Sequence, residues 1–204
     1  MARPASDIPQ RILQAARQRF VQQGVDGASL RQIARDAETN IGMIYYYYKS
    51  KDELFLAAIE DTYAALVRDI AIALSPDATV EQRMRNLYAR LAKLSDDEHE
   101  VLILILREGL SSSQRMTRIA ERFRTGHLPL VVGLVQDGMR DGSLRNDVHP
   151  LALMAATFVL GLMPQIAHRQ VSASELPIAK MLPSPQQAAD ALLDVVLHGV
   201  RRPT

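Results

Sequence analysis

Apolar residues recur three and four positions apart along most of the chain, and this is the spacing of amphipathic helices. The first such segment, residues 9–23, puts four apolar side chains on one face: Ile12, Leu13, Ala16 and Phe20. Stretches rich in Gly, Pro, Ser and Asp separate it from the segments that follow. The pattern therefore predicts a series of helices joined by turns.

Capping signals mark where most of these helices begin. A Ser or Thr followed three positions later by Glu or Gln forms a capping box. Five such pairs precede apolar-periodic segments: Ser29 with Gln32, Ser50 with Glu53, Thr79 with Gln82, Ser95 with Glu98, and Ser184 with Gln187. Asn40 is a further N-cap candidate. We therefore expect an all-α protein of about nine helices and no strand, over residues 9–23, 29–37, 41–48, 51–74, 79–94, 95–109, 113–140, 150–168 and 185–199.

Some segments contain residues that are compatible with more than one structure or that interrupt a helix. The run VLILIL, residues 101–106, is compatible with a buried strand or a buried helix. We favour a helix, because a capping box precedes the run, Gly109 follows it and no partner strand is evident. Gly126 and Pro129 predict a break in helix 113–140, and Pro164 predicts a kink in the next helix. Residues 170–184 have the composition of a mobile linker.

The composition is that of a soluble globular protein, with 48% hydrophobic and 23% charged residues in 204. There is no cysteine, which excludes disulfides and thiolate metal sites and suits the reducing cytoplasm. The N-terminal residues lack the apolar core of a signal peptide. Residues 151–164 alone resemble a membrane span, but they are shorter than the ~20 residues needed. We expect a cytoplasmic protein in which this segment is a buried or subunit-interface helix.

Charge is distributed unevenly although the net charge is only +1. Residues 1–51 carry eight Lys or Arg against four acidic residues, whereas the remainder is slightly acidic. A basic N-terminal module on a mildly acidic body is compatible with a polyanionic partner at that end of the chain.

Four consecutive tyrosines stand near the end of this basic module, at positions 45–48. In a helix, successive side chains point about 100° apart, so the four rings cannot all face one core. Two short helices, 29–37 and 41–48, follow a bracing helix, which is the arrangement of a helix-turn-helix. We expect Ile44 and Tyr48 to face inward, with Gly42 allowing close approach, and the other tyrosines to face DNA phosphates.

The stretch SLRQIARDAETNIGMIYYYYKSKDELFLAAI resembles the DNA-binding domain of the tetracycline-repressor (TetR) family. The matching residues are Ile33, Ala34, Ala37, Gly42, Ile44, Tyr45, Lys49, Ser50, Lys51 and Leu54. The resemblance implies a helix-turn-helix domain over residues 8–68 and a helical ligand-binding and dimerisation domain over residues 69–204. It also implies DNA contacts from Ser29, Leu30, Thr39, Asn40, Ile41, Gly42, Met43, Tyr45, Tyr46, Tyr47 and Lys51.

The chain departs from the family pattern in the turn between the two short helices. Glu38 stands where the family usually has glycine, and a non-glycine residue at positive φ costs about 1 kcal/mol. Its negative charge also lies near the expected DNA surface. Tyr47 replaces the usual His, and Tyr48 replaces the usual Phe.

The C-terminal half is rich in Leu, Met, Ala and Val, and the resemblance implies a ligand cavity there. The candidate lining residues are Met84, Tyr88, Leu106, Phe123, His127, Met154, Phe158 and Met163; ordinary core packing is the alternative for each. Helices 150–168 and 185–199 are expected to form a homodimer interface.

No residue pattern indicates catalysis, a cofactor or a bound metal. The five histidines are scattered, and the run DDEHE, residues 96–100, fits an acidic first helical turn. We therefore expect a non-enzymatic DNA-binding transcriptional regulator, a homodimeric repressor released from a near-palindromic operator by a small, largely apolar ligand. The alternative is a helical ligand-binding or scaffold protein that has lost specific DNA binding, which Glu38 would favour.

Overall fold

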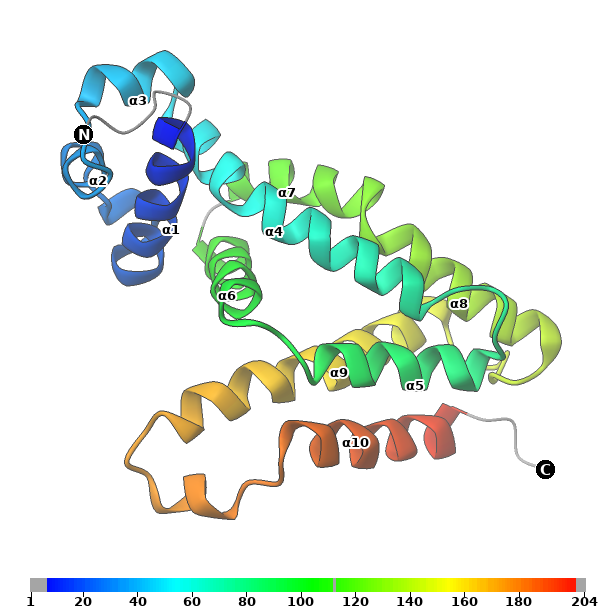
Figure 1. The fold of residues 1–204 in the computed structure, drawn as a ribbon. Coiled ribbons are helices and arrows are strands. Elements are labelled where there is room, and N and C mark those ends of the chain that lie inside the picture. Colours follow the sequence, from blue (N-terminus) through cyan, green and yellow to red (C-terminus); the bar gives the residue numbers. More distant parts are fainter. Residues whose placement is uncertain (1–6, 112, 201–204) are drawn as a thin grey trace. The chain divides into compact units, whose positions relative to one another are not determined.

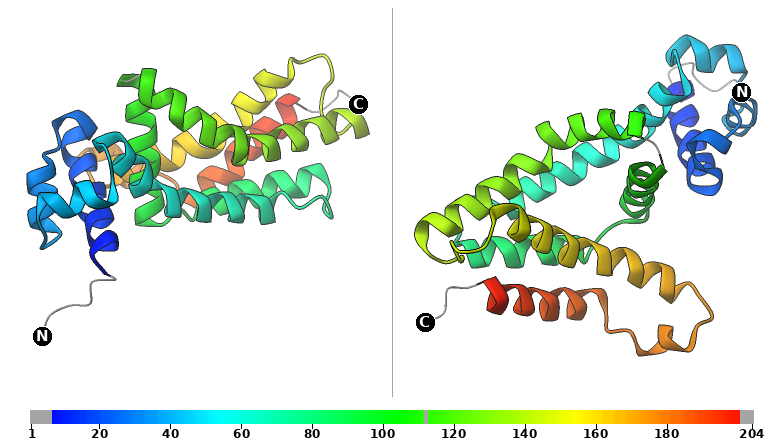
Figure 2. Two further views of the ribbon diagram at one scale, coloured as in Figure 1. Left: turned by 90° about the horizontal axis from the view of Figure 1, so that it is seen from above. Right: turned by 180° about the vertical axis from the view of Figure 1, so that it is seen from behind.

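The computed structural model describes residues 7–111 and 113–200, and this part of the chain is all-helical (Figures 1 and 2). It contains ten α-helices, one 3-10 helix (η2) and no strand, so the expected fold class is confirmed. The elements are α1 (Ile8–Gly27), α2 (Leu30–Asp36), α3 (Ile41–Tyr47), α4 (Lys51–Ala73), α5 (Val80–Leu91), α6 (Asp96–Ser111), α7 (Ser113–Thr125), α8 (His127–Asp141), α9 (Pro150–Ser172), η2 (Pro177–Met181) and α10 (Pro185–Val200).

The helices group into two compact units. The first unit takes in α1 to α3, α4 up to Ala65, α6, and α7 up to Arg122. The second takes in the rest of α4 and α7 together with α5, α8, α9 and α10. Whether function divides near residue 68, as the sequence suggests, stays a prediction.

The predicted capping residues begin the helices at most of the expected positions. The side-chain oxygens of Asn40, Ser50 and Thr79 each accept a hydrogen bond from the backbone N–H three residues on, at 3.1–3.2 Å. Ser184 and Gln187 form the complete reciprocal box, at 3.2 and 2.9 Å. Ser29 occupies the N-cap of α2 without forming a side-chain cap bond.

In the second half of the chain the structure has the predicted helix at 101–106 and the predicted break at Gly126, but not a wholly irregular linker. The run at 101–106 is helical, within α6, and four of its six side chains are buried. The break at Gly126 is complete, so α7 and α8 are separate helices and the total is ten rather than nine. Pro129 is the third residue of α8, where its missing N–H costs no helical hydrogen bond. The expected linker is partly ordered, because α9 extends to Ser172 and η2 follows.

Helix α9 is long and apolar enough to cross a membrane by length and composition alone. In the second unit, however, it packs against α5, α8 and α10. Tyr88 on α5 is fully buried and donates a hydrogen bond from its hydroxyl to the Thr157 carbonyl oxygen at 3.1 Å. Gly161 permits this close packing, since a Cβ there would lie 3.1 Å from Leu91 Cδ1. These contacts are those of a core helix in a helical bundle.

The core of the first unit holds the two short helices against α1 and α4. Phe20 and Phe55 meet edge to face with ring centroids 5.8 Å apart. Ile12, Ile33 and Ile44 are also buried, from α1, α2 and α3 respectively. At the α1–α2 contact, Arg19 binds both carboxylate oxygens of Asp36.

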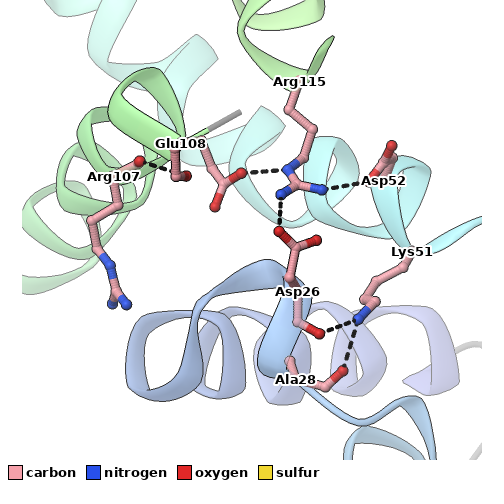
Figure 3. A network of polar contacts seen from close by, with 8 residues as sticks. Asp26, Ala28, Lys51, Asp52, Arg107, Glu108 and Arg115 are labelled. Carbon is pink, nitrogen blue, oxygen red and sulfur yellow. Dashed lines mark hydrogen bonds and ion pairs between the residues drawn. The ribbon is translucent and has the colours of Figure 1, made fainter. Parts of the chain in front are cut away.

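A network of ion pairs centred on Arg115 joins four helices of the first unit (Figure 3). The Arg115 guanidinium donates to Asp26 at 2.7 Å, to Asp52 at 3.3 Å and to Glu108. The Arg115 and Glu108 side chains are only 10% and 5% exposed. The hydrogen bond to Arg115 lowers the pKa of the Asp26 carboxyl below its usual value. One buried cation therefore ties the end of α1 and the start of α4 to α6 and α7.

Replacing Arg115 by Gln leaves the buried Glu108 carboxylate without its cationic partner. We expect Arg115→Gln to lower the free energy of unfolding by about 3 kcal/mol, measured by urea denaturation, because breaking a buried pair strands a charge. Arg122→Gln on the same helix is the matched control. Arg122 pairs with Glu60 at 3.1 Å but is 51% exposed, so we expect a loss of about 0.5 kcal/mol. Equal losses in the two variants would contradict this role of Arg115.

Candidate nucleic-acid interface and ligand cavity

Helix α3 is anchored by one side chain. Of its seven residues only Ile44 is buried, at 1% exposure. Asn40 fixes the start of the helix by accepting the Met43 N–H. Because helical side chains are spaced about 100° apart, burying Ile44 turns Tyr45 and Tyr46 outward, and they are 55% and 78% exposed. The sequence prediction that the tyrosine run presents rings to solvent is confirmed for these two.

The two later tyrosines are partly covered by contacts within the run. Tyr47 is 37% exposed, and its ring meets Tyr46 edge to face at 5.0 Å and Tyr48 at 6.3 Å. Tyr48 is half-buried, and burial raises the pKa of its hydroxyl. Tyr46, Tyr47 and Tyr48 therefore form a row of ring contacts that runs from an exposed ring to a half-buried one.

The prediction that Gly42 allows α3 to approach the core closely is wrong. Gly42 is exposed and does not bring α3 close to the core. A Cβ at this position would lie 3.0 Å from Asn40 Oδ1, the atom that caps the helix. Glycine therefore protects the N-cap, because a larger residue would press on the capping oxygen.

The eleven predicted DNA contacts all lie in the first unit. Asn40, Gly42 and the three tyrosines at 45–47 are exposed. The others are half-buried: Ser29, Leu30, Thr39, Ile41, Met43 and Lys51. They come from the start of α2, the turn, α3 and the first residue of α4, and α2 and α3 pack on one another. Arg31, Arg35 and Lys49, which are exposed, add positive charge to these elements.

Lys51 has a structural contact that the sequence did not suggest. Its ammonium donates to the carbonyl oxygens of Asp26 at 2.8 Å and Ala28 at 3.1 Å, at the end of α1 (Figure 3). A cation at helix-terminal carbonyls is favourable. Lys51 therefore holds α4 to α1, and its contact with a DNA phosphate stays a prediction.

The turn between α2 and α3 has the backbone conformation that the sequence comparison suggested. Glu38 has φ of +49°, the only positive φ outside glycine among the described residues. Arg11 supports this turn, donating from Nη1 to the Ala37 carbonyl oxygen at 2.8 Å and lying 3.5 Å from the Glu38 carboxylate. The Glu38 side chain is 67% exposed, so its charge remains on the surface.

A small apolar cavity lies within the second unit. Its lining residues come from the end of α4 and from α5, α8 and α9: Ile70, Leu87, Leu91, His127, Val131, Thr157 and Phe158. Its volume of about 20 Å³ is room for one water molecule. Of the eight residues predicted from the sequence, only His127 and Phe158 line it.

The other six predicted ligand residues lie elsewhere. Tyr88 and Met84 are fully buried in packing, Met154 is buried on α9, and Met163 is half-buried. Phe123 contacts the His127 ring, and Leu106 belongs to α6 of the first unit. Leu87 and Leu91, which do line the cavity, carry no distinguishing signal because their four-residue spacing is that of any core helix.

His127 is the centre of an aromatic cluster beside the cavity. Its ring stacks nearly parallel to Phe158, at 5.5 Å and 10°, and meets Phe123 edge to face at 4.8 Å. Burial lowers the pKa of the imidazole to about 4. The ring is therefore neutral at physiological pH.

Helices α9 and α10 also carry apolar side chains on their surface. Leu151 and Val159 on α9 are 65% and 48% exposed, and Val195 on α10 is 61% exposed. The two helices pack against one another within the second unit. They are the helices for which the sequence predicts a subunit interface.

Comparison with known proteins identifies relatives along the whole chain. The profile of the bacterial regulatory proteins of the tetR family matches residues 12–58. The HTH-type transcriptional repressor NicS of Pseudomonas putida is 26% identical, over 98% of this chain and 96% of NicS. The uncharacterized HTH-type transcriptional regulator TtgW of Pseudomonas putida is 30% identical, over 60% of this chain and 92% of TtgW. The crystal structure of FadR from Bacillus subtilis, in complex with stearoyl-CoA, has a TM-score of 0.75 at 16% identity and covers 94% of this chain and 99% of FadR.

Relieving the positive φ at residue 38 is expected to stabilise the first unit. Glu38→Gly should raise the free energy of unfolding by about 1 kcal/mol, because glycine adopts this conformation without a Cβ clash. Glu38→Ala removes the same carboxylate but keeps the strain, so it should give no gain. Urea denaturation measures both. An equal gain from alanine would show that charge, and not backbone strain, governs this turn.

The neutral His127 makes stability depend on pH. The unfolded chain takes up a proton on this residue near pH 6.5, whereas the folded protein does so only near pH 4. Because the unfolded state binds more protons in this window, stability falls as the pH drops from 6.5 towards 4. Between pH 7.5 and 5.0, wild type should lose about 2 kcal/mol more unfolding free energy than His127→Gln. Identical pH profiles would contradict a buried neutral imidazole.

Proposed function

Because the chain belongs to the tetR family of bacterial regulatory proteins, we propose that it is a homodimeric repressor released from its operator by a small, largely apolar ligand. The observation that carries this proposal is the outward-facing edge of α3, anchored by Ile44 alone, inside the segment that matches the family profile. Its relatives are transcriptional regulators, and we propose the same non-enzymatic role here, in the cytoplasm.

The proposed reading element is α3, inserted into the major groove of duplex DNA. Tyr45, Tyr46 and Tyr47 have hydroxyls with the reach to hydrogen-bond phosphate oxygens, which sets the position of the helix. Ile41 and Met43 are partly exposed and offer apolar contact to thymine methyl groups. Ser29, Leu30, Thr39, Asn40, Gly42 and Lys51 complete the proposed contact set.

A homodimer would present two copies of α3 to a near-palindromic operator. The exposed apolar residues on α9 and α10, Leu151, Val159 and Val195, support these helices as the interface. Pairing both helices with their symmetry mates gives a four-helix interface. Two-fold symmetry then places the half-sites one or more helical turns apart.

The second unit is the proposed ligand-binding part. The cavity beside His127 and Phe158 holds only about 20 Å³, so a ligand must stabilise a conformation in which this space is larger. Such a ligand shifts the protein away from the DNA-binding form only by its difference in affinity for the two forms. A tenfold loss of DNA affinity requires about 1.4 kcal/mol of coupling.

Mobility-shift titrations on DNA from around the protein's own gene test the proposal. Tyr46→Phe removes one hydroxyl from each subunit and should weaken binding of the dimer roughly 25-fold, about fivefold for each of the two hydrogen bonds. Tyr46→Ala should weaken binding further while leaving helicity unchanged by circular dichroism, because this ring is 78% exposed. Lack of any sequence-specific shift at low salt would instead favour a scaffold or ligand-binding protein that no longer binds DNA.

The same assay separates the two roles of Lys51. If the ammonium of each subunit neutralises a phosphate, Lys51→Ala removes two contacts per dimer and should flatten the dependence of log affinity on log salt by about two units. If it only holds α4 to α1 through the Asp26 and Ala28 carbonyls, the variant loses stability and keeps the wild-type slope. That second result would remove Lys51 from the DNA contacts.

A further inference from the structure

We infer that the cavity of the second unit recognises an uncharged molecule with a planar aromatic ring, which stacks against Phe158 and His127. This inference rests on the proposed function, because it names the chemistry of the ligand that the same cavity would take. Three observations carry it: the cavity walls bear no charge, an aromatic cluster lies beside them, and the chain breaks at Gly126 where α8 begins.

The walls of the cavity carry no charge. Five of the seven lining residues are apolar, and the other two are Thr157 and His127. The Thr157 hydroxyl donates to the Leu153 carbonyl oxygen at 2.8 Å, inside α9. The His127 ring is neutral because burial lowers its pKa to about 4. An ion buried here would lose its hydration without gaining a countercharge, which is strongly unfavourable.

The cluster beside the cavity contains both phenylalanines of this unit. The chain has four phenylalanines; Phe20 and Phe55 pair in the first unit, and Phe123 and Phe158 flank His127. Aromatic rings gain energy from offset-stacked or edge-to-face contacts beyond burial alone. A planar ring inserted between Phe158 and His127 replaces their one mutual stack by a stack on each of the two rings. A saturated ligand of equal size would lose both contacts.

The chain break at Gly126 suits a movement of α8. Gly126 is the N-cap of α8, with non-helical φ and ψ of −99° and −117°, and His127 is the first helical residue. Turning the first residues of α8 at this break draws His127 away from Phe158 without opening the interior of either helix. The space opened between His127 and Phe158 then accommodates a planar ring.

Three probes built on the same fused bicyclic ring system test the inference on the intact protein without DNA: 2-naphthol, its saturated counterpart 2-decalol and the anion 2-naphthoate. Isothermal titration calorimetry should give one 2-naphthol site per chain, with 2-decalol bound about tenfold more weakly for want of ring stacking. Binding of 2-naphthoate should be undetectable. Equal affinity for 2-decalol, tighter binding of 2-naphthoate, or no binding of 2-naphthol would each overturn the inference.

Two variants locate the site. Phe158→Leu should reduce 2-naphthol affinity about tenfold and remove the preference over 2-decalol. Phe20→Leu takes a buried ring from the other unit and should leave the preference unchanged, which controls for general destabilisation. An unchanged preference in Phe158→Leu would contradict the stacking role, and the three-probe comparison on wild type stands even if this variant does not fold.

The probes also keep this inference separate from the proposed function. The preference for 2-naphthol over 2-decalol is measured without DNA, so a protein that does not bind DNA can still confirm the aromatic ligand. Conversely, a protein that binds an operator and prefers 2-decalol would keep its place as a repressor and lose the aromatic ligand.

Discussion

The orientation of α3 depends on the burial of a single side chain, Ile44. A seven-residue helix is too short to be stable alone, so its direction comes from packing and capping. Ile44 supplies the packing, and the Asn40 side chain supplies the cap. Once these two are fixed, helical geometry leaves Tyr45 and Tyr46 no position except the surface. The proposed DNA-reading edge is thus a consequence of how the helix is anchored.

Ion pairs and hydrogen bonds elsewhere in the first unit hold together the helices that surround α3. Arg115 ties α1, α4, α6 and α7 through three carboxylates, and Lys51 binds the carbonyl oxygens at the end of α1. Glu38 has the opposite effect on stability, because its backbone has a positive φ in the turn between α2 and α3. A glycine would relieve the strain, so the residue found there is not the one that stability alone favours. Its exposed carboxylate lies beside the proposed DNA surface, where it would oppose nonspecific binding.

The sequence predicted the features that depend on neighbouring residues. Capping at Asn40, Thr79 and Ser184 and the break at Gly126 follow from local chemistry, and all are present. The positive φ at residue 38 was suggested by the family resemblance, because the family usually has glycine there. Features set by contacts distant in the sequence were not predictable. The periodicity of Leu87 and Leu91 does not distinguish a cavity wall from a core. Likewise, the carbonyl oxygens bound by Lys51 lie 23 to 25 residues earlier in the chain.

Selecting bound sequences from a pool of random duplex DNA with the purified protein tests the central claim most directly. The account predicts enrichment of one near-palindrome with two half-sites at a fixed spacing, because a two-fold pair of α3 helices reads adjacent turns of the groove. Enrichment of a single unrepeated site would contradict the dimer. The absence of any enriched sequence would contradict DNA reading by α3 altogether.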